Sequence, residues 1–297
     1  MRLFEMNGAD LLCNTLLAND IDVCFANPGT SEMHFVAALD RQPRMRCVLG
    51  LFEGVVTGAA DGYARMADKP AATLLHLGPG LANGLANLHN AKRAKSQIVN
   101  IVGDHATYHL KYDAPLTSDI ESLARPMSDW VGRAETADMV GVRTQEAIRA
   151  ARRQPGHIST LMLHADAAWT ETAAPTPSPA ETEKLPLADA VRIKEAALAL
   201  RTGRNTMIVI SGLGLREKQL ELLDRIAQKT NARLLAQQSN GRLQRGAGRI
   251  RLDRVPYVID KALEVFADTE QVLLVGAKSP VGFFAYPGKP SSMLPET

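Results

Sequence analysis

Short apolar runs of strand length alternate with longer segments of helical spacing through the first two-thirds of the chain. The apolar runs cover residues 22–26, 46–49, 72–77, 98–103 and 157–164. The segments with helical spacing cover 31–39, a small-residue stretch ending near 66, 81–93 and 135–152. Strands that alternate with helices form βαβ units, which build a parallel sheet with helices on both faces. The pattern therefore predicts an α/β fold, doubly wound and mostly parallel.

The alternation stops at residues 170–186 and then resumes. This interruption is rich in proline, which fixes the backbone and removes amide donors, so we expect an extended linker there. After it come further runs of strand and helix length, at 187–200, 206–210, 214–229, 232–235, 256–266 and 271–275. We predict a first domain over 1–169, a linker over 170–186 and a second, Rossmann-like domain over 187–297.

Composition excludes several classes of protein. The 297 residues are 45% hydrophobic and 22% charged, which is typical of a globular chain with room for two cores. A formal charge of +2 and an aromatic content of 5% argue against a nucleic-acid surface. No apolar run reaches the length of a membrane span, and no signal peptide opens the chain. Three cysteines without metal-ligand spacing suit reduced thiols, so we expect a cytoplasmic protein.

Glu53 is the one charged residue in the apolar stretch 47–60. A carboxylate buried there needs a partner or acquires a raised pKa. It is either a partly exposed glutamate at a helix start, or a carboxyl group that exchanges a proton with a buried partner. Gly54, Gly58 and Gly62 follow at four-residue spacing, which predicts close helix packing, either within the core or across a subunit interface.

Three glycine-bearing turns follow predicted strands, at 27–31, 76–80 and 103–105. In open α/β sheets, ligands bind at the carboxyl ends of the strands. We therefore expect these turns to form one wall of a binding site.

Three segments, taken in order, resemble one protein family. They are PGTSEMHFVAAL (28–39), FEGVVTGAADGYAR (52–65) and GPGLANGLANLHNA (78–91). Together they are similar to the pyrimidine-binding domain of thiamine-diphosphate enzymes, in the branch of acetolactate synthase, pyruvate oxidase and benzoylformate decarboxylase. The resemblance covers roughly residues 3–165, and residues 187–297 resemble the family's central domain more loosely. It implies paired subunits, with the cofactor between one subunit's pyrimidine domain and a partner's diphosphate domain.

The resemblance also implies roles for particular residues. Glu53 occupies the position of the glutamate that hydrogen-bonds the cofactor's aminopyrimidine ring and so promotes loss of the thiazolium carbon proton. The activated carbon then attacks a 2-oxo acid, which loses CO₂. The other positions implied to contact the cofactor are Pro28, Gly29, Thr30, Gly78, Pro79, Gly80 and Asn83.

His76 departs from acetolactate synthases and resembles the active-site histidine of benzoylformate decarboxylase. Thr30 stands where that enzyme has a serine near its substrate. A histidine can transfer protons near neutral pH, so we interpret His76 as a second catalytic residue. The alternative is a histidine hydrogen-bonded at a strand end.

Two further patterns are weaker. His105 and His109 are four residues apart but have no evident third ligand, so we predict no metal site in this chain. The turn 211–214 is an incomplete glycine fingerprint. Since the central domain of acetolactate synthases holds FAD, a flavin contact and a domain without a nucleotide site both stay open.

The resemblance predicts a third domain that this sequence does not show. The family's Gly-Asp-Gly…Asn motif, which holds Mg²⁺ and the diphosphate, is not found here. We expect the chain to be inactive alone, with Mg²⁺ supplied through a missing domain or a partner chain. The predicted function is the thiamine-diphosphate-binding portion of a 2-oxo acid decarboxylase or carboligase, acetolactate-synthase-like and homodimeric or larger. The alternatives are a benzoylformate-decarboxylase-like lyase, a noncatalytic dimerising or regulatory module and, less favoured, a dinucleotide-dependent oxidoreductase.

Overall fold

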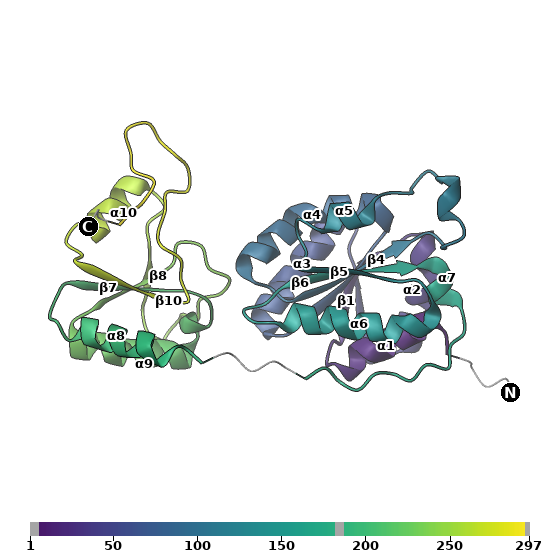
Figure 1. Cartoon of the computed structure of the whole chain (residues 1–297), viewed down its shortest axis with the longest axis horizontal. Helices are drawn as coiled ribbons and strands as arrows, with labels where there is room; N and C mark the ends of the chain where they lie inside the picture. The colour runs from purple at the N-terminus through teal and green to yellow at the C-terminus, as the bar shows by residue number, and fades with distance from the viewer. Residues whose placement is uncertain (1–5, 182–186, 295–297) are drawn as a thin grey trace. The chain divides into compact units, whose positions relative to one another are not determined.

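A computed structural model describes residues 6–181 and 187–294 of the chain. It divides into two compact units, Met1–Leu185 and Pro186–Thr297, and each is described by itself (Figure 1). Within the described residues, no helix is both long enough and apolar enough to cross a membrane.

The first unit is a six-stranded parallel sheet in the order β2-β1-β3-β4-β6-β5. Its strands are β1 (Val23–Asn27), β2 (Arg46–Leu49), β3 (Ala71–Leu75), β4 (Ile98–Asp104), β5 (Trp130–Ala134) and β6 (Ile158–His164). The central strands β3, β4 and β6 are buried along their whole length. Strands covered on both faces read as continuous apolar runs, which explains why the hydrophobic pattern located them.

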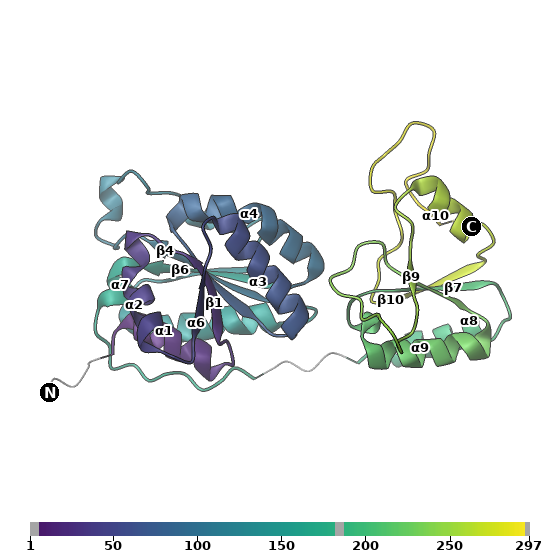
Figure 2. The ribbon, with the colours of Figure 1, turned by 180° about the vertical axis from the view of Figure 1, so that it is seen from behind.

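Helices cover both faces of this sheet (Figures 1 and 2). One core lies under α1 (Gly8–Ala18), α2 (Met33–Arg41), α6 (Ala137–Arg152) and α7 (Ala165–Trp169). The other core lies under α3 (Glu53–Ala67), α4 (Leu77–Ala94) and α5 (Ile120–Ala124). Two short 3₁₀ helices, η1 (Thr30–Glu32) and η2 (Leu110–Tyr112), complete the unit. The predicted doubly wound α/β class is confirmed.

Helix α4 begins earlier than the sequence pattern predicted. It starts at Leu77, so Gly78, Pro79 and Gly80 form its first turn instead of a preceding loop. Proline is accommodated at the start of a helix because the amide that it lacks would have no intrahelical partner there. The consequence is that these three residues stand on a rigid element.

The proline-rich segment after α7 is extended, and its described part lies against the first unit. The backbone amide of Ala180 donates to Asn19 Oδ1 (2.7 Å), and the Gln145 side chain donates to the Ser178 carbonyl (2.6 Å). The rest of the predicted linker, residues 182–186, lies outside the described residues.

The second unit is a four-stranded parallel sheet in the order β10-β7-β8-β9. Its strands are β7 (Thr206–Ile210), β8 (Arg233–Ala236), β9 (Asp253–Arg254) and β10 (Gln271–Val275). The helices α8 (Ala190–Leu200) and α9 (Glu217–Thr230) lie on one face, and α10 (Ile259–Phe266) lies on the other (Figure 1). Strand β9 has only two residues, too few to leave a periodic signal, and the sequence pattern missed it.

Candidate functional site

Glu53 is the first residue of α3 and is buried, with 7% of its surface exposed. Its partner is a neutral amide from α4, because Asn83 Nδ2 donates to Glu53 Oε2 over 3.0 Å. The second carboxyl oxygen, Oε1, makes no hydrogen bond to any residue that the structure describes. A Cβ on Gly80 would lie 3.1 Å from this oxygen, so the glycine leaves free space beside it.

Close packing of α3 on α4 fixes the position of this carboxyl group. The Thr57 hydroxyl donates to the Gly84 carbonyl (3.0 Å), and Asn87 Nδ2 donates to the Gly54 carbonyl (2.6 Å). A Cβ on Gly58 would lie 3.1 Å from Asn87 Nδ2. Gly54 and Gly58 therefore serve packing within the unit, one of the two alternatives that the sequence left open. Gly62 differs from them, because a Cβ there would meet nothing within 4 Å.

His76 is paired with a carboxyl group that the sequence analysis did not single out. His76 Nδ1 lies 2.7 Å from Glu32 Oε2, and the Gly29 amide donates to the same oxygen over 2.8 Å. Glu32 ends η1 and is only 2% exposed, and this burial raises the pKa of its carboxyl group. Its other oxygen, Oε1, is buried without a hydrogen-bond partner in the described structure.

Two glycines make room for the Glu32–His76 pair. A Cβ on Gly29 would lie 2.3 Å from the His76 ring, and a Cβ on Gly103 would lie 1.7 Å from Glu32 Oε1. Both distances are far below van der Waals contact, so no larger residue fits at either position without movement. The sequence signal for Glu32 was its place three residues after Gly29, the spacing of an acid that reaches back to a backbone amide at the start of a helix.

Gly80 is the common neighbour of the two candidate catalytic residues. A Cβ on Gly80 would be 3.1 Å from Glu53 Oε1 and 3.4 Å from His76 Cβ. Thr30 and Pro79 are exposed, whereas Pro28 and Gly29 are partly buried. Gly78 is buried, and a Cβ there would lie 2.3 Å from Ser118 Oγ. The turn after β1 and the first turn of α4 thus converge at the carboxyl ends of β1 and β3.

The histidines after β4 make ring and backbone contacts, and His105 Nε2 is buried without a hydrogen-bond partner in the described structure. The rings of His105 and His109 are 5.5 Å apart, and His164 Nδ1 hydrogen-bonds the His105 carbonyl over 2.9 Å. His164 also lies 3.6 Å from Asp104, a buried carboxyl group whose pKa burial raises. No group of three or more His, Cys, Asp or Glu side chains suitable for a metal occurs among residues 6–181 and 187–294.

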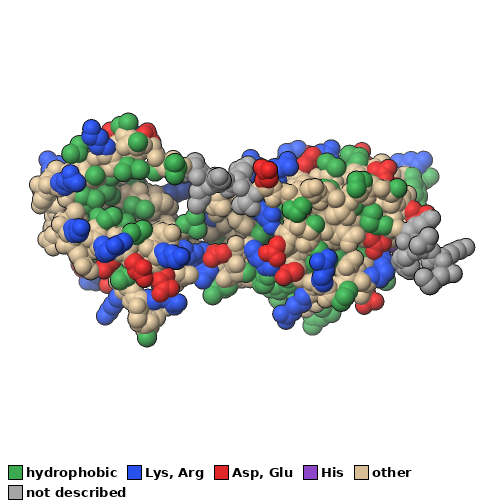
Figure 3. All heavy atoms as spheres, turned by 90° about the horizontal axis from the view of Figure 1, so that it is seen from below, with side chains coloured by type: hydrophobic (Ala, Val, Ile, Leu, Met, Phe, Trp, Pro, Cys, Tyr) green, Lys and Arg blue, Asp and Glu red, His purple; other side chains and the backbone are tan. Residues whose placement is uncertain are grey.

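The surface around Glu53 is apolar. Leu51 is 92% exposed, Leu49 67%, Val55 60% and Phe52 50%. These four residues, which we call the Leu49–Val55 strip, run from the last residue of β2 to the first turn of α3. Elsewhere, Lys and Arg side chains are interspersed with Asp and Glu over the face seen in Figure 3, and no continuous basic surface appears on that face.

Comparison with known proteins identifies the family to which the first unit is related. The family model "Thiamine pyrophosphate enzyme, N-terminal TPP binding domain" matches residues 6–124, which include Glu32, Glu53, His76 and Asn83. Residues 6–124 therefore carry the N-terminal TPP-binding domain of the thiamine pyrophosphate enzymes. IlvX of Mycobacterium tuberculosis, which is named provisionally as an acetolactate synthase large subunit, is 53% identical over 98% of this chain and 56% of its own length.

Other relatives are more distant. Benzoylformate decarboxylase of Pseudomonas aeruginosa is 31% identical over 57% of this chain and 31% of its own length. The thiamine diphosphate-dependent 4-hydroxybenzoylformate decarboxylase of Rhodococcus jostii RHA1 has a TM-score of 0.84 at 21% identity, over 98% of this chain and 55% of that one. This likeness shows the shared fold. The chain spans about half the length of the relatives that it matches along nearly its whole extent.

Proposed function

We propose that the first unit binds the aminopyrimidine end of thiamine diphosphate at Glu53, as part of an acetolactate-synthase-like 2-oxo acid decarboxylase or carboligase. The observation that carries this proposal is the carboxyl group of Glu53 itself. It is held at a helix start by Asn83, it is largely shielded from water, and one oxygen is left unbonded beside Gly80.

Glu53, Asn83 and Gly80 fit the aminopyrimidine ring of thiamine diphosphate. An aminopyrimidine offers ring nitrogens and an amino group, and a carboxyl group can share a proton with a ring nitrogen. Burial favours such sharing because it weakens competition from water. When bound, thiamine diphosphate supplies a thiazolium carbon that attacks the 2-oxo acid and takes up the electrons released with CO₂. Glu53 would hold and exchange the proton at its Oε1, while Asn83 fixes Oε2.

We assign proton transfer to His76, with Glu32 as its positioning residue. An ionised Glu32 accepts from Nδ1–H, and the neutral ring then presents Nε2 with a free lone pair. This arrangement supports the second candidate, a benzoylformate-decarboxylase-like lyase, since such a histidine could move a proton to or from the reacting substrate. The exposed Thr30 hydroxyl, close to the same turn, would contact that substrate.

Binding of the diphosphate with Mg²⁺ needs a group of metal ligands. The described residues contain no group of three or more His, Cys, Asp or Glu side chains that could hold a metal ion. We propose that another domain or a partner chain provides these ligands and covers the Leu49–Val55 strip. A strip so exposed beside a buried carboxyl group is suited to an interface. A second copy of this chain, in a homodimer or larger assembly, is one candidate for the covering partner. We also propose a cytoplasmic location, because the cysteines are free thiols. Burial raises the thiol pKa values of Cys13 and Cys24.

The test is binding followed by turnover. The protein should be titrated with thiamine diphosphate and Mg²⁺, alone and with a chain carrying the diphosphate-binding domain, and then assayed with pyruvate and benzoylformate. Cofactor-dependent CO₂ release only in the mixed sample supports the proposal, and the preferred 2-oxo acid separates the two candidate activities. In that active sample, Glu53→Gln should strongly slow proton exchange at the thiazolium carbon, and unchanged exchange would refute the role of Glu53. Flavin absorbance of the purified protein decides whether FAD is also bound.

A further inference from the structure

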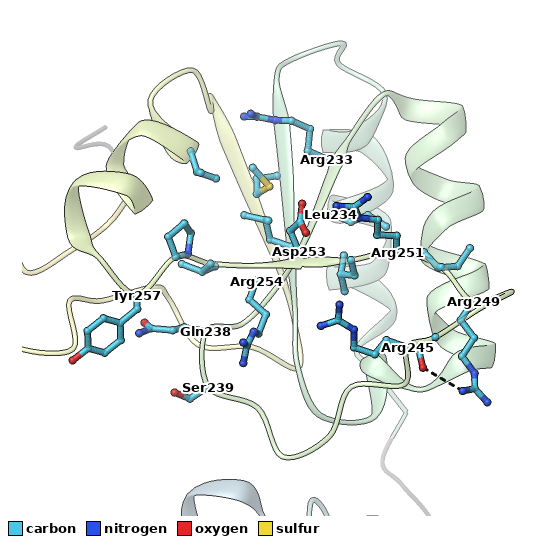
Figure 4. A pocket seen from close by; sticks show the side chains of 18 of the residues that line it. Arg233, Leu234, Gln238, Ser239, Arg245, Arg249, Arg251, Asp253, Arg254 and Tyr257 are labelled. Atoms are coloured by element: carbon cyan, nitrogen blue, oxygen red, sulfur yellow. Dashed lines mark hydrogen bonds between the residues drawn. The ribbon is translucent and has the colours of Figure 1, made fainter.

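The two units differ in the chemistry that they leave unused. The second unit has a pocket of about 1200 Å³ along β8 and β9, but its charged groups do not converge on one point. The Arg251 guanidinium lies on the other side of β9 from those of Arg245 and Arg254 (Figure 4). The first unit contains all three cysteines of the chain, and the proposed thiamine chemistry uses none of them.

The cysteines come from three elements but lie on one face of the sheet. Cys24 in β1 and Cys47 in β2 are direct partners in the parallel register of these strands. Such partners point to the same face. Cys24 belongs to the core beneath α1, which also contains Cys13. Burial raises the pKa of the Cys24 thiol, and the nearby thiols of Cys47 and Cys13 raise it further. The chain therefore gathers its three thiols near one edge of the sheet.

The strand geometry brings Cys24 and Cys47 within reach of a disulfide. Neighbouring strands lie about 4.8 Å apart. A disulfide needs Cα atoms about 4.4–6.8 Å apart and Cβ atoms about 3.5–4.5 Å apart. The strand spacing satisfies the first requirement, and a small approach of one strand to the other satisfies the second. Strand β2 is free to make this approach, because it is the edge of the sheet and pairs with β1 alone among the described strands.

Only one of the three thiols is open to solvent. Cys47 is exposed, whereas Cys13 and Cys24 are completely buried. A small oxidant therefore reaches Cys47 first, and the thiol beside it in the sheet is Cys24. Burial of part of its surface raises the pKa of Cys47, so little of the reactive thiolate is present at neutral pH. We therefore expect a response to sustained exposure to an oxidant and not to traces of it.

We propose that Cys24 and Cys47 form an oxidisable dithiol, a modification site that acts as a redox-sensitive switch at the edge of the first unit. Hydrogen peroxide oxidises the Cys47 thiol to a sulfenic acid and releases one water. The Cys24 sulfur then attacks the Cys47 sulfur. An S–S bond forms, the S–O bond breaks, and the oxygen leaves as a second water with the proton of Cys24. The two thiols lose two electrons, which the peroxide gains, and a dithiol reductant reverses the change.

The switch acts on the segment that follows β2. This strand ends at Leu49, and the chain then leads directly to Glu53 at the start of α3. A disulfide that draws β2 toward β1 should therefore alter the backbone of the Leu49–Val55 strip. Hydrogen–deuterium exchange of residues 46–56 reports this change without any cofactor.

The experiment treats the whole chain with a molar excess of hydrogen peroxide, alkylates the remaining thiols in denaturant and maps the products by mass spectrometry. Cleavage before aspartate places Cys13, Cys24 and Cys47 in separate peptides, 10–19, 22–39 and 40–60. Oxidation should join the last two peptides and reduce the alkylated cysteines from three to one, and dithiothreitol should restore all three. Exchange of residues 46–56 should change on oxidation.

Matched variants identify the thiols that react. Cys47→Ser removes an exposed side chain, so the variant should fold, and peroxide should form no disulfide in it. The control Cys13→Ala should form the disulfide as the wild type does. The proposal is overturned by a disulfide between Cys13 and Cys24, by Cys47 that ends as a sulfinic acid or joins only a second chain, or by a Cys24–Cys47 disulfide that leaves exchange of residues 46–56 unchanged. No measurement here needs thiamine diphosphate, so this proposal and the thiamine proposal can fail separately.

Discussion

Removing the carboxyl group of Glu32 should change which nitrogen of His76 carries the proton. Two changes separate the contributions of shape and charge. Glu32→Leu removes the acceptor of both the His76 and the Gly29 hydrogen bonds, whereas Glu32→Gln keeps an acceptor oxygen without the negative charge. A readout of the imidazole ring needs no cofactor and no partner chain, so it can be made on this protein directly.

The size of the effect follows from the 2.7 Å contact between Nδ1 and Oε2. A hydrogen bond to a charged acceptor contributes about 1.5–3 kcal/mol, which is a preference of about 10- to 150-fold for the tautomer protonated at Nδ1. A neutral acceptor contributes about 0.5–1.5 kcal/mol and therefore gives only about a 2- to 12-fold preference. We expect the Nδ1–H form to dominate in the wild type, to persist more weakly in Glu32→Gln, and to lose its preference in Glu32→Leu.

The assay is ¹⁵N NMR of ring-labelled histidine at pH 8, with the His76 signals assigned by their loss in His76→Asn. Circular dichroism of each variant checks that the fold is intact. The reasoning fails if the wild-type ring is protonated at Nε2, or if Glu32→Leu leaves the tautomer unchanged.

The remaining predictions concern the same buried groups. Asn83→Ala should weaken thiamine diphosphate binding with little change in urea stability, because Asn83 is exposed and its side chain hydrogen-bonds Glu53 alone among the described residues; equal affinity in calorimetry would count against it. Gly103→Ala should lower the free energy of unfolding by about 1–3 kcal/mol through overlap with Glu32, whereas Gly62→Ala, with open space around it, should raise it by up to about 1 kcal/mol; urea denaturation compares the two. Burial raises the folded-state pKa of Glu32, so the folded protein binds its proton more tightly than the unfolded chain, and stability should fall as pH rises from about 4.3 toward that raised pKa. Denaturation across this pH range should show a flatter profile for Glu32→Gln, and an identical profile would refute the assignment.

Much of the fold could be predicted because its signals are local. Strands β2, β7 and β10 have the predicted boundaries, since each is a short apolar run between polar turns. Helix α1 was missed although Asn7 and Asp10 form a capping box at its start. Strand β5 was also missed, because it lies at the edge of the sheet and is only partly buried.

The candidate site was predictable only in part. Glu53 stands out as a lone charge in an apolar run, and His76 stands out at the end of a strand. Glu32 acquires its importance from a partner 44 residues away, and no local pattern reports that contact.

The most direct test of the central claim is saturation-transfer NMR of thiamine and thiamine diphosphate with the whole chain. Saturation of protein signals should reach the 2-methyl group and the ring proton of the aminopyrimidine. It should fall sharply in Glu53→Ala and stay unchanged in the exposed control Glu264→Ala. Transfer that is absent from the aminopyrimidine, or that is the same in wild type and Glu53→Ala, would contradict the account.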